Sequence, residues 1–513
     1  MSEGSPEHLD VLIVGAGLSS VGAAWHLQQR CPGKRYAILE ARGDLGGTWD
    51  LFRYPGIRSD SDMHTLGYRF KPWTASKSIT DGPSILEYVR ETARDNGIEE
   101  KIRFGYRVVA AEWSSAEARW TVEAERTGGG AEDGERVRLT CDFLWTCSGY
   151  YRYDEGYTPE FEGVDRFPGP VVHPQHWPED LDYSGKRVVV IGSGATAVTL
   201  VPAMAEQAAH VTMLQRSPTY IASLPAQDRL AAWLRRRLPE RAAYAIVRWK
   251  NVLIQTAFYQ LSRRRPETIK RFIRKGVARS LPAGYDVDKH FKPHYNPWDQ
   301  RMCLVPDGDL FRAISKGEAS VVTDRIASFT ERGIALESGE ELEADVIVTA
   351  TGLNLLFLGG MELSVDGEPV DIPGKMTYKG MMLSGVPNMA FTVGYTNASW
   401  TLKADLTSEY VCRLLRHMDA HGYRRCLPEV DPSVTEQPLL DFTSGYVQRS
   451  LDEFPKQGSK EPWKLRQNYV FDIRTIRRGE IEDGAMRFGL GEAGSVDECK
   501  PSSPSRSLSS ASP

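Results

Sequence analysis

The chain has 513 residues, of which 41% are hydrophobic and 26% are charged, and its formal net charge is −5. This length exceeds that of one ordinary domain, so we expect two or three domains. The slightly acidic, otherwise ordinary composition excludes a basic nucleic-acid-binding protein. No stretch of about 18 apolar residues occurs, so the sequence predicts no membrane span.

Seven cysteines are scattered along the chain without a Cys-x-x-Cys pair, which argues against a disulfide reductase and a zinc ribbon. An odd and sparse cysteine count is typical of a reducing compartment. The first strand is expected to begin near residue 9, which leaves no room for a signal peptide. We therefore expect a cytoplasmic protein.

A nucleotide-binding pattern opens the chain. A short apolar strand at residues 10–14 is followed by Gly15-x-Gly17 and a helix-like run, and the next strand ends on Glu40. The two glycines permit a tight turn whose backbone N–H groups approach a pyrophosphate at the helix N-terminus. Glu40 is placed to accept hydrogen bonds from a ribose 2′-OH. Ser20 replaces the third glycine of the pattern and is small enough for close helix–strand packing. The pattern predicts a dinucleotide site, with a purely structural turn as the alternative.

A second glycine-rich stretch covers residues 46–60 and follows the pattern G-G-x-W-x-x-x-x-Y-P-G-x-x-x-D. Gly46 and Gly47 permit close contact with the phosphate and ribose of a bound nucleotide. Tyr-Pro-Gly is a turn signal. Asp60 ends the stretch with a carboxylate, for which the alternative is a capping role on a loop.

The same strand–loop–helix pattern recurs in the middle of the chain. An apolar strand at 187–191 leads into Gly192-x-Gly194-x-x-Ala197, and the strand after the next helix ends on Arg216 instead of an acid. A guanidinium at this position suits a 2′-phosphate, with which an acid would clash. We therefore expect the second loop to bind NADPH and the first to bind a dinucleotide with a free ribose 2′-OH, such as FAD.

This internal repeat predicts an α/β fold with two Rossmann-like dinucleotide-binding domains and a helical insertion in the NADPH domain. The insertion carries basic runs at 235–237 and 263–265. These runs could contact a membrane surface or belong to solvated helix faces, and we favour solvated helix faces. The expected boundaries are a disordered N-terminus at 1–8, the FAD domain at 9–155 and 381–490, a linker at 156–186, the NADPH domain at 187–221 and 299–380, the insertion at 222–298, and a disordered tail at 491–513.

The linker contains F-x-G-x-x-x-H-x-x-x-W-P, with Phe167, Gly169, His173 and Trp177 at the fixed positions. A Pro-rich linker whose aromatic residues pack between domains would be the plain interpretation. Together with the stretch at 46–60, however, this motif resembles the fingerprints of type I Baeyer–Villiger monooxygenases. The resemblance spans roughly residues 9–490 and is strongest to the mycobacterial ethionamide-activating subgroup.

The resemblance implies an FAD-containing, NADPH- and O₂-dependent enzyme that converts ketones to esters through a C4a-peroxyflavin and also oxidises sulfides or thioamides. It places Arg301 against the flavin, where a guanidinium stabilises peroxide and oxyanion charge, and Asp60 beside Arg301. His173 and Trp177 would couple the linker to the nicotinamide. The alternatives are a flavin-containing N- or S-monooxygenase, and a non-catalytic FAD-binding redox sensor.

No histidine spacing in the linker or the insertion matches a metal site, so no metal is expected. The small-molecule partners are a ketone or sulfide and O₂, without nucleic acid. The catalytic residues are expected to be Arg301 and Asp60. The expected cofactor-binding residues are Gly15, Gly17, Ser19, Glu40, Gly47, Thr48, Trp49, Arg58, Ser59, Asp60, Val108, His173, Trp177, Gly192, Ser193, Gly194, Ala195, Thr196, Ala197, Arg216 and Ser217.

Overall fold

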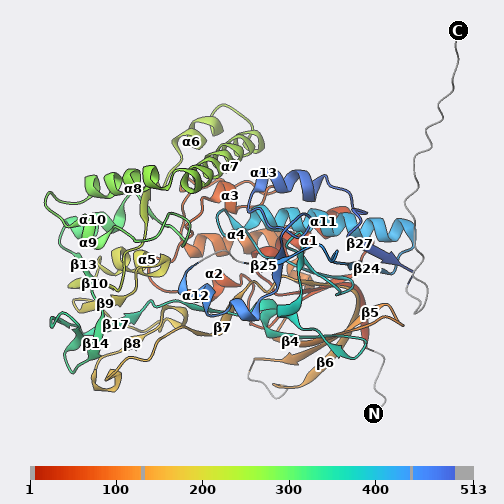
Figure 1. The fold of residues 1–513 in the computed structure, drawn as a ribbon, viewed down its shortest axis with the longest axis horizontal. Helices are drawn as coiled ribbons and strands as arrows, with labels where there is room; N and C mark the ends of the chain where they lie inside the picture. Colours follow the sequence, from red (N-terminus) through yellow and green to blue (C-terminus); the bar gives the residue numbers. More distant parts are fainter. Residues whose placement is uncertain (1–5, 129–132, 440–442, 491–513) are drawn as a thin grey trace, which may run out of the picture.

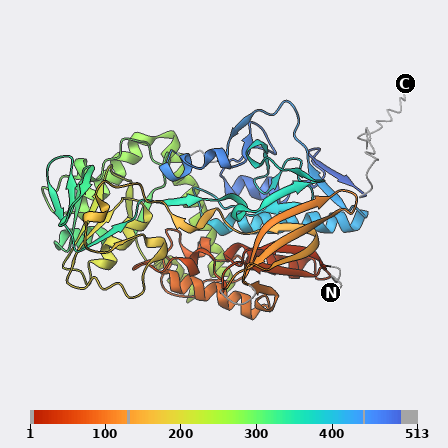
Figure 2. The same cartoon turned by 90° about the horizontal axis from the view of Figure 1, so that it is seen from below.

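The computed structural model describes residues 6–128, 133–439 and 443–490, and it consists of two bodies side by side along the long axis (Figures 1 and 2). The body at the right of Figure 1 is built on one mixed sheet. Its strands run in the order β20 (Glu368–Pro369), β19 (Glu362–Val365), β4 (Tyr106–Ser114), β5 (Arg119–Arg126), β6 (Arg136–Thr146), β1 (Glu7–Val14), β2 (Tyr36–Glu40) and β3 (Ile102–Phe104), with β23 (Met389–Phe391) also beside β6.

Strands β1, β2, β3 and β23 are parallel to their neighbours, whereas β4, β5 and β6 form an antiparallel meander. Successive side chains of β1 point to opposite faces of the sheet, and both faces are covered, so alternate residues pack in different cores. Val11 and Ile13 pack with three helices, and Leu12 and Val14 pack with the meander. The helices are α1 (Leu18–Arg30), α4 (Gly82–Asp95) and α11 (Trp400–His421).

The second body holds a parallel sheet in the order β13 (Ala319–Thr323), β10 (His210–Gln215), β9 (Arg187–Ile191), β17 (Val346–Thr349) and β8 (Val171–Val172). One face packs on α5 (Ala195–Met204) and α10 (Asp309–Ser315). The other face packs on a small antiparallel sheet of β14 (Ile326–Phe329), β15 (Gly333–Leu336) and β16 (Glu341–Glu343). Both faces are therefore buried, and the strands read as continuous apolar runs.

The insertion is helical and contains α6 (Arg229–Arg235), α7 (Glu240–Arg264), α8 (Pro266–Ser280) and α9 (Val287–His290). It lies between the paired strands β11 (Ile221–Leu224) and β12 (Cys303–Pro306). Tyr244 of α7 donates a hydrogen bond to the carbonyl oxygen of Tyr68 in the first body. The apolar face of α8 packs into the core of the second body. The insertion thus spans both bodies.

Two boundaries differ from the sequence expectation. Residues 362–369 were expected in the NADPH domain, but β19 pairs with β4 of the first sheet, with Glu362 opposite Ala110. The chain returns to the first body through β18 (Leu353–Leu355), which pairs with β7 (Tyr151–Gly156), and therefore well before residue 381. β1 begins at Glu7, inside the segment expected to be disordered. The rest of that segment up to residue 5, and the tail at 491–513, lie outside the described residues.

No helix in the described residues is long and apolar enough to cross a membrane. Further short helices and strands connect the larger elements. They are α2 (Thr48–Leu51), α3 (Met63–Leu66), α12 (Gly445–Gln448), α13 (Tyr469–Asp472), β21 (Thr377–Tyr378), β22 (Met382–Leu383), β24 (Arg425–Pro428), β25 (Glu436–Pro438), β26 (Lys456–Gly458) and β27 (Met486–Gly489).

Candidate functional site

A cavity of about 1150 Å³ lies where the two bodies meet, and both glycine loops contribute to its wall. The cavity has the size and mixed polar and apolar lining that are typical of a cofactor and substrate site. It also meets the rule that open parallel sheets bind ligands beyond the carboxyl ends of their strands.

The first loop passes directly against the neighbouring strand end. Gly15 has a φ of +92°, and a Cβ there would lie 3.0 Å from the backbone oxygen of Cys147. Any side chain would therefore need an unfavourable backbone and displace β6. Gly17 caps α1 without a side-chain hydrogen bond, so the first N–H groups of this helix remain available at the cavity wall. This arrangement fits a phosphate group.

Glu40 lies at the end of β2 beside this loop and is 6% exposed. Its carboxylate accepts hydrogen bonds from the backbone N–H of Ala16 at 2.6 Å and of Arg42 at 2.9 Å. Burial raises the pKa of Glu40, and these two hydrogen bonds act against the rise. The carboxylate oxygens can accept further bonds, and Glu40 lines the cavity, as a ribose contact requires.

The second loop has the same local arrangement as the first. Gly192 has a φ of +133°, and a Cβ there would collide with the carbonyl oxygen of Ala350 at the end of β17. Gly194 caps α5, again without a side-chain hydrogen bond. The repeat that the sequence suggested is therefore a repeat of local geometry, in which a glycine loop crosses a neighbouring strand end in each body.

Arg216 follows β10 and lines the cavity. Gln215 pairs in register with Thr323 of β13, so Arg216 and Asp324 follow the ends of adjacent strands. The next residue, Arg325, also lines the cavity and was missed by the sequence analysis. The sequence signal that could have identified Arg325 is a basic residue just after the end of a parallel strand. Two guanidinium groups on one wall suit a phosphate monoester.

Arg301 and Asp60 form an ion pair in the wall. Arg301 Nη2 lies 2.8 Å from Asp60 Oδ2 and 3.0 Å from Oδ1. The Arg301 side chain is 40% exposed because it faces the open cavity, although protein surrounds it on its other sides. The charge of Asp60 raises the pKa of Arg301 well above its usual range, and burial only partly opposes this. The guanidinium is therefore charged at every working pH.

Aromatic side chains surround this pair and were also missed. Tyr150 and Tyr446 line the cavity, and the ring of Tyr150 lies 5.2 Å from that of Trp400. Trp400 Nε1 donates a hydrogen bond of 2.7 Å to Ser19 Oγ, which ties the start of α11 to the first loop. Trp400 lies within the segment 381–490 that the sequence assigned to the FAD domain, but its side-chain partner lies 381 residues away.

The cavity wall includes most of the residues that the sequence analysis selected. Arg58 forms an ion pair with Asp309 there, and Thr48 hydrogen-bonds Tyr153 at 3.3 Å. The predicted residues in the wall are Gly15, Gly17, Ser19, Glu40, Gly47, Thr48, Trp49, Arg58, Ser59, Asp60, Val108, Gly192, Ser193, Gly194, Ala195, Thr196, Arg216, Ser217 and Arg301. Ala197, His173 and Trp177 lie outside it.

His173 acts on the wall indirectly. Its Nε2 donates a hydrogen bond of 3.0 Å to the carbonyl oxygen of Gly352, which lines the cavity. Its Nδ1 accepts a bond of 3.2 Å from the backbone N–H of Gln175. Burial lowers the pKa of His173, so the ring is neutral near pH 7. Trp177 packs edge-on against Tyr183. The linker motif therefore contacts residues of the cavity wall without lining the cavity itself.

Residues 79–365 match the family described as flavin-binding monooxygenase-like, and residues 13–75 match an NAD(P)-binding Rossmann-like domain. The FAD-containing monooxygenase EthA of Mycobacterium tuberculosis is 62% identical over 484 residues, which cover 94% of this chain and 98% of that protein. The chain belongs to the flavin-binding monooxygenase-like family.

Other similar proteins are more distant in sequence. The putative FAD-containing monooxygenase MymA of Mycobacterium tuberculosis is 54% identical over 94% of this chain and 98% of its own length. A solved steroid monooxygenase bound to NADP superposes with a TM-score of 0.73 at 23% identity, over 94% of this chain and 99% of that one. The predicted flavin monooxygenase assignment and the α/β fold with two dinucleotide-binding domains are thereby confirmed.

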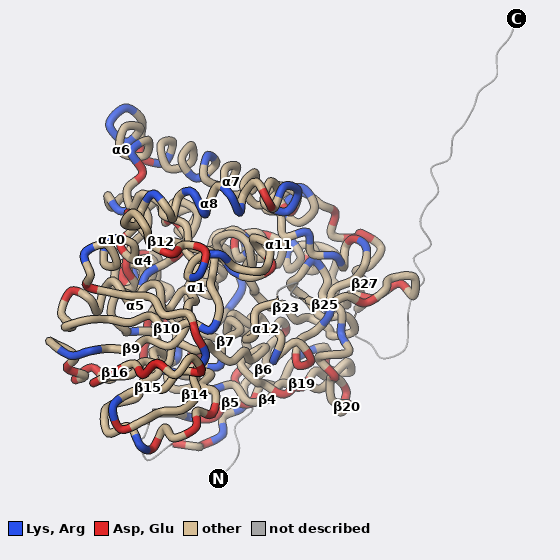
Figure 3. Tube along the Cα trace, turned by 60° about the vertical axis from the view of Figure 1, so that its left-hand side comes forward, with Lys and Arg blue, Asp and Glu red and all other residues tan. Residues whose placement is uncertain are grey.

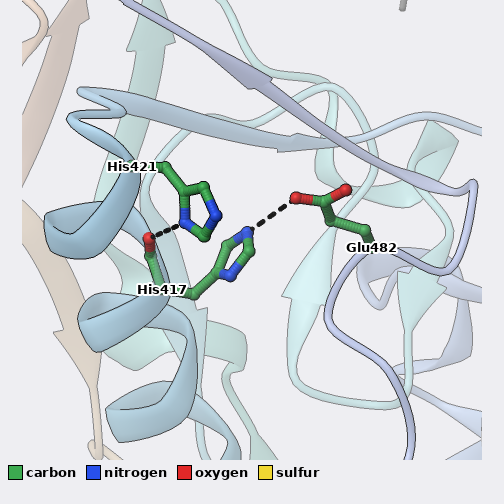
Figure 4. A group of neighbouring side chains, drawn as sticks. All are labelled: His417, His421 and Glu482. Carbon is green, nitrogen blue, oxygen red and sulfur yellow. Dashed lines mark hydrogen bonds and ion pairs between the residues drawn. The ribbon is translucent and has the colours of Figure 1, made fainter.

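Two histidines and a glutamate, which are residue types that can bind a metal, cluster apart from the cavity wall at the C-terminal end of α11 (Figure 4). His417 and His421 are one helical turn apart, and their rings and the carboxylate of Glu482 face one another. His417 Nε2 lies 2.9 Å from Glu482 Oε1, and His421 Nδ1 bonds the His417 carbonyl oxygen at 2.9 Å. The sequence analysis did not consider this i, i+4 pair.

Proposed function

We propose that this flavin monooxygenase binds FAD at the first loop and NADPH at the second, and that it inserts one oxygen atom beside a ketone carbonyl to give an ester. Sulfides and thioamides are further substrates. The observation that carries this proposal is the Arg301–Asp60 ion pair in a wall shared by both loops. The six described cysteines are buried and unpaired, which fits the cytoplasm.

The first loop and its surroundings hold FAD in this proposal. The N-terminus of α1 faces the pyrophosphate and Glu40 accepts hydrogen bonds from the ribose. Arg216 and Arg325 hold the 2′-phosphate that distinguishes NADPH from NADH. The bound flavin supplies hydride acceptance and oxygen activation, which no amino-acid side chain provides.

Arg301 stabilises the negative charge that develops on the substrate's carbonyl oxygen when the carbonyl carbon is attacked. A fixed donor aimed at developing charge lowers the barrier because it needs no reorganisation during reaction. Asp60 holds the guanidinium in place, since it engages Nη2 from one side and leaves the others free for the cavity.

Oxidation of a soft sulfur or nitrogen atom does not develop charge on a carbonyl oxygen and needs no such donor. The presence of Arg301 in the cavity wall therefore favours a ketone-oxidising enzyme over an enzyme that oxidises only nitrogen or sulfur. A redox sensor would not need a cavity of this size beside both loops.

The test uses the purified, FAD-loaded protein with NADPH, a panel of ketones and sulfides, and isotopically labelled O₂. We expect ketone-stimulated NADPH consumption and an ester that contains one labelled oxygen atom. Sulfoxide formation with no ester from any ketone would favour the N- or S-oxidising alternative. NADPH consumption that no substrate stimulates would favour the sensor.

A further inference from the structure

The outer face of α7 carries large apolar side chains, which an ordinary surface helix turns toward the core. Ile246, Trp249, Leu253 and Leu261 recur at helical spacing and are 44–54% exposed. The inner face carries buried polar side chains beside the buried apolar residues Val247 and Val252. Arg248 is 4% exposed and donates hydrogen bonds to the carbonyl oxygens of His64 and Gly67, among others. The helix thus presents its apolar stripe to the outside.

The neighbouring helices extend this apolar surface. Trp233 on α6 is 53% exposed and Phe272 on α8 is 69% exposed. Of the thirteen large apolar side chains that are exposed among the described residues, ten lie between Leu224 and Phe272. The three helices form one edge of the molecule in Figures 1 and 3. Single exposed apolar residues are normal, but such a concentration marks an interaction surface.

The same edge is strongly basic. Residues 229–280 contain fifteen Lys and Arg against two acidic residues, although the whole chain has a net charge of −5. Figure 3 shows blue segments along α6, α7 and α8. The arginine runs at 235–237 and 263–265 lie at the ends of α6 and α7, on either side of the apolar stripe.

We propose that the edge formed by α6, α7 and α8 is a membrane-docking surface that binds an anionic lipid bilayer. The apolar stripe enters the boundary between headgroups and acyl chains, and the flanking arginines contact lipid phosphates. The sequence alone favoured solvated helix faces, because runs of charged residues are usually solvated. The structure adds that an apolar stripe between the two runs faces outward. A second copy of this chain fits less well, since two such basic edges would repel each other.

The inner face of α7 explains why the helix does not rotate to bury its stripe. Asn251 Nδ2 donates to Asp62 Oδ1 at 2.7 Å, and Gln255 Nε2 donates to Asp62 Oδ2 at 3.0 Å. Asp62 caps α3 and lies two residues from Asp60. The docking helix is therefore fixed to the segment that carries the site, and its outer residues can be changed without touching these bonds.

The test is co-sedimentation of the full-length, FAD-loaded protein with vesicles. One set contains equal parts of phosphatidylglycerol and phosphatidylcholine, and the other contains phosphatidylcholine alone. We expect binding to the anionic set, much weaker binding to the neutral set, and loss of binding near 1 M salt, where charge attraction is screened within about 3 Å. Binding that is equal for both sets would overturn the charge argument.

The variants separate the apolar stripe from other exposed residues. Leu253→Ser should weaken partitioning roughly tenfold, because a leucine no longer leaves water on docking. Leu490→Ser is the matched control, since Leu490 is 68% exposed but lies outside the edge, and it should bind like the wild type. Wild type that stays in the supernatant with anionic vesicles would overturn the proposal. So would a Leu253→Ser variant that binds vesicles normally but loses self-association in light scattering.

Discussion

Arg301 Nη2 lies 2.8 Å from Asp60 Oδ2, so one ion pair joins two residues that are 241 positions apart and belong to different bodies. Asp60 follows the glycine-rich stretch of the first body, and Arg301 precedes β12, which packs in the core of the second. The guanidinium can therefore face both cofactor loops only when the two bodies are correctly placed.

Gly15→Ala should yield folded protein with little bound FAD. The substitution places a Cβ 3.0 Å from the backbone oxygen of Cys147 at a φ of +92°, so the loop must shift away from the pyrophosphate. The measurement is flavin absorbance per mole of purified protein. Gly33→Ala is the control, because a Cβ there meets nothing within 4 Å, and it should retain full flavin. Equal flavin content in the two variants would mean that the first loop is structural.

Arg216→Ala should narrow the preference for NADPH over NADH. A lost charge-assisted contact with the 2′-phosphate costs about 1.5–3 kcal/mol, or roughly 10–100-fold in kcat/KM for NADPH. The kcat/KM for NADH should change little. Arg325→Ala should act in the same direction, whereas Arg332→Ala, on the exposed surface, serves as the control. An unchanged NADPH preference in both cavity variants would place the phosphate elsewhere.

His173→Gln should destabilise the protein more at neutral pH than in acid. The two hydrogen bonds of the neutral ring contribute about 1 kcal/mol each. Because the folded-state pKa of His173 is lowered from 6.5, the unfolded chain takes up the proton more readily. The free energy of unfolding of the wild type therefore falls as the pH drops below about 6.5.

The difference in Tm between wild type and His173→Gln should accordingly shrink from pH 8 to pH 5.5. His176→Gln is the control, since His176 bonds a carbonyl oxygen at an exposed position and should show no such trend. A Tm difference that is constant over this range would contradict a neutral, buried His173.

The local features of the site were predictable from sequence because each depends on a short stretch. Gly15, Gly192 and Glu40 occupy positions that are set by one strand, one turn and one helix, and the structure has them in the cavity wall. The helical insertion was expected at 222–298, and its four helices lie between Arg229 and His290.

Features that depend on distant partners were not predictable. The Trp400–Ser19 hydrogen bond and the role of Gln175, which donates to the carbonyl oxygens of Arg152 and Tyr153, leave no mark in the local pattern. The position of β19 in the first sheet is set by pairing with β4, 252 residues earlier, so its boundary was misjudged. The sequence analysis of the insertion likewise did not indicate that an apolar face of α7 lies outside.

The central claim is that Arg301 stabilises substrate charge and is not required for flavin reduction, and its most direct test separates those two steps. Arg301→Ala should bind FAD and be reduced by NADPH in stopped-flow measurements, yet release hydrogen peroxide in place of ester, because loss of one oxyanion donor costs about 10²–10³ in rate. Asp60→Asn should lose coupling more mildly. Ester formation by Arg301→Ala at near wild-type rate and coupling would contradict the account.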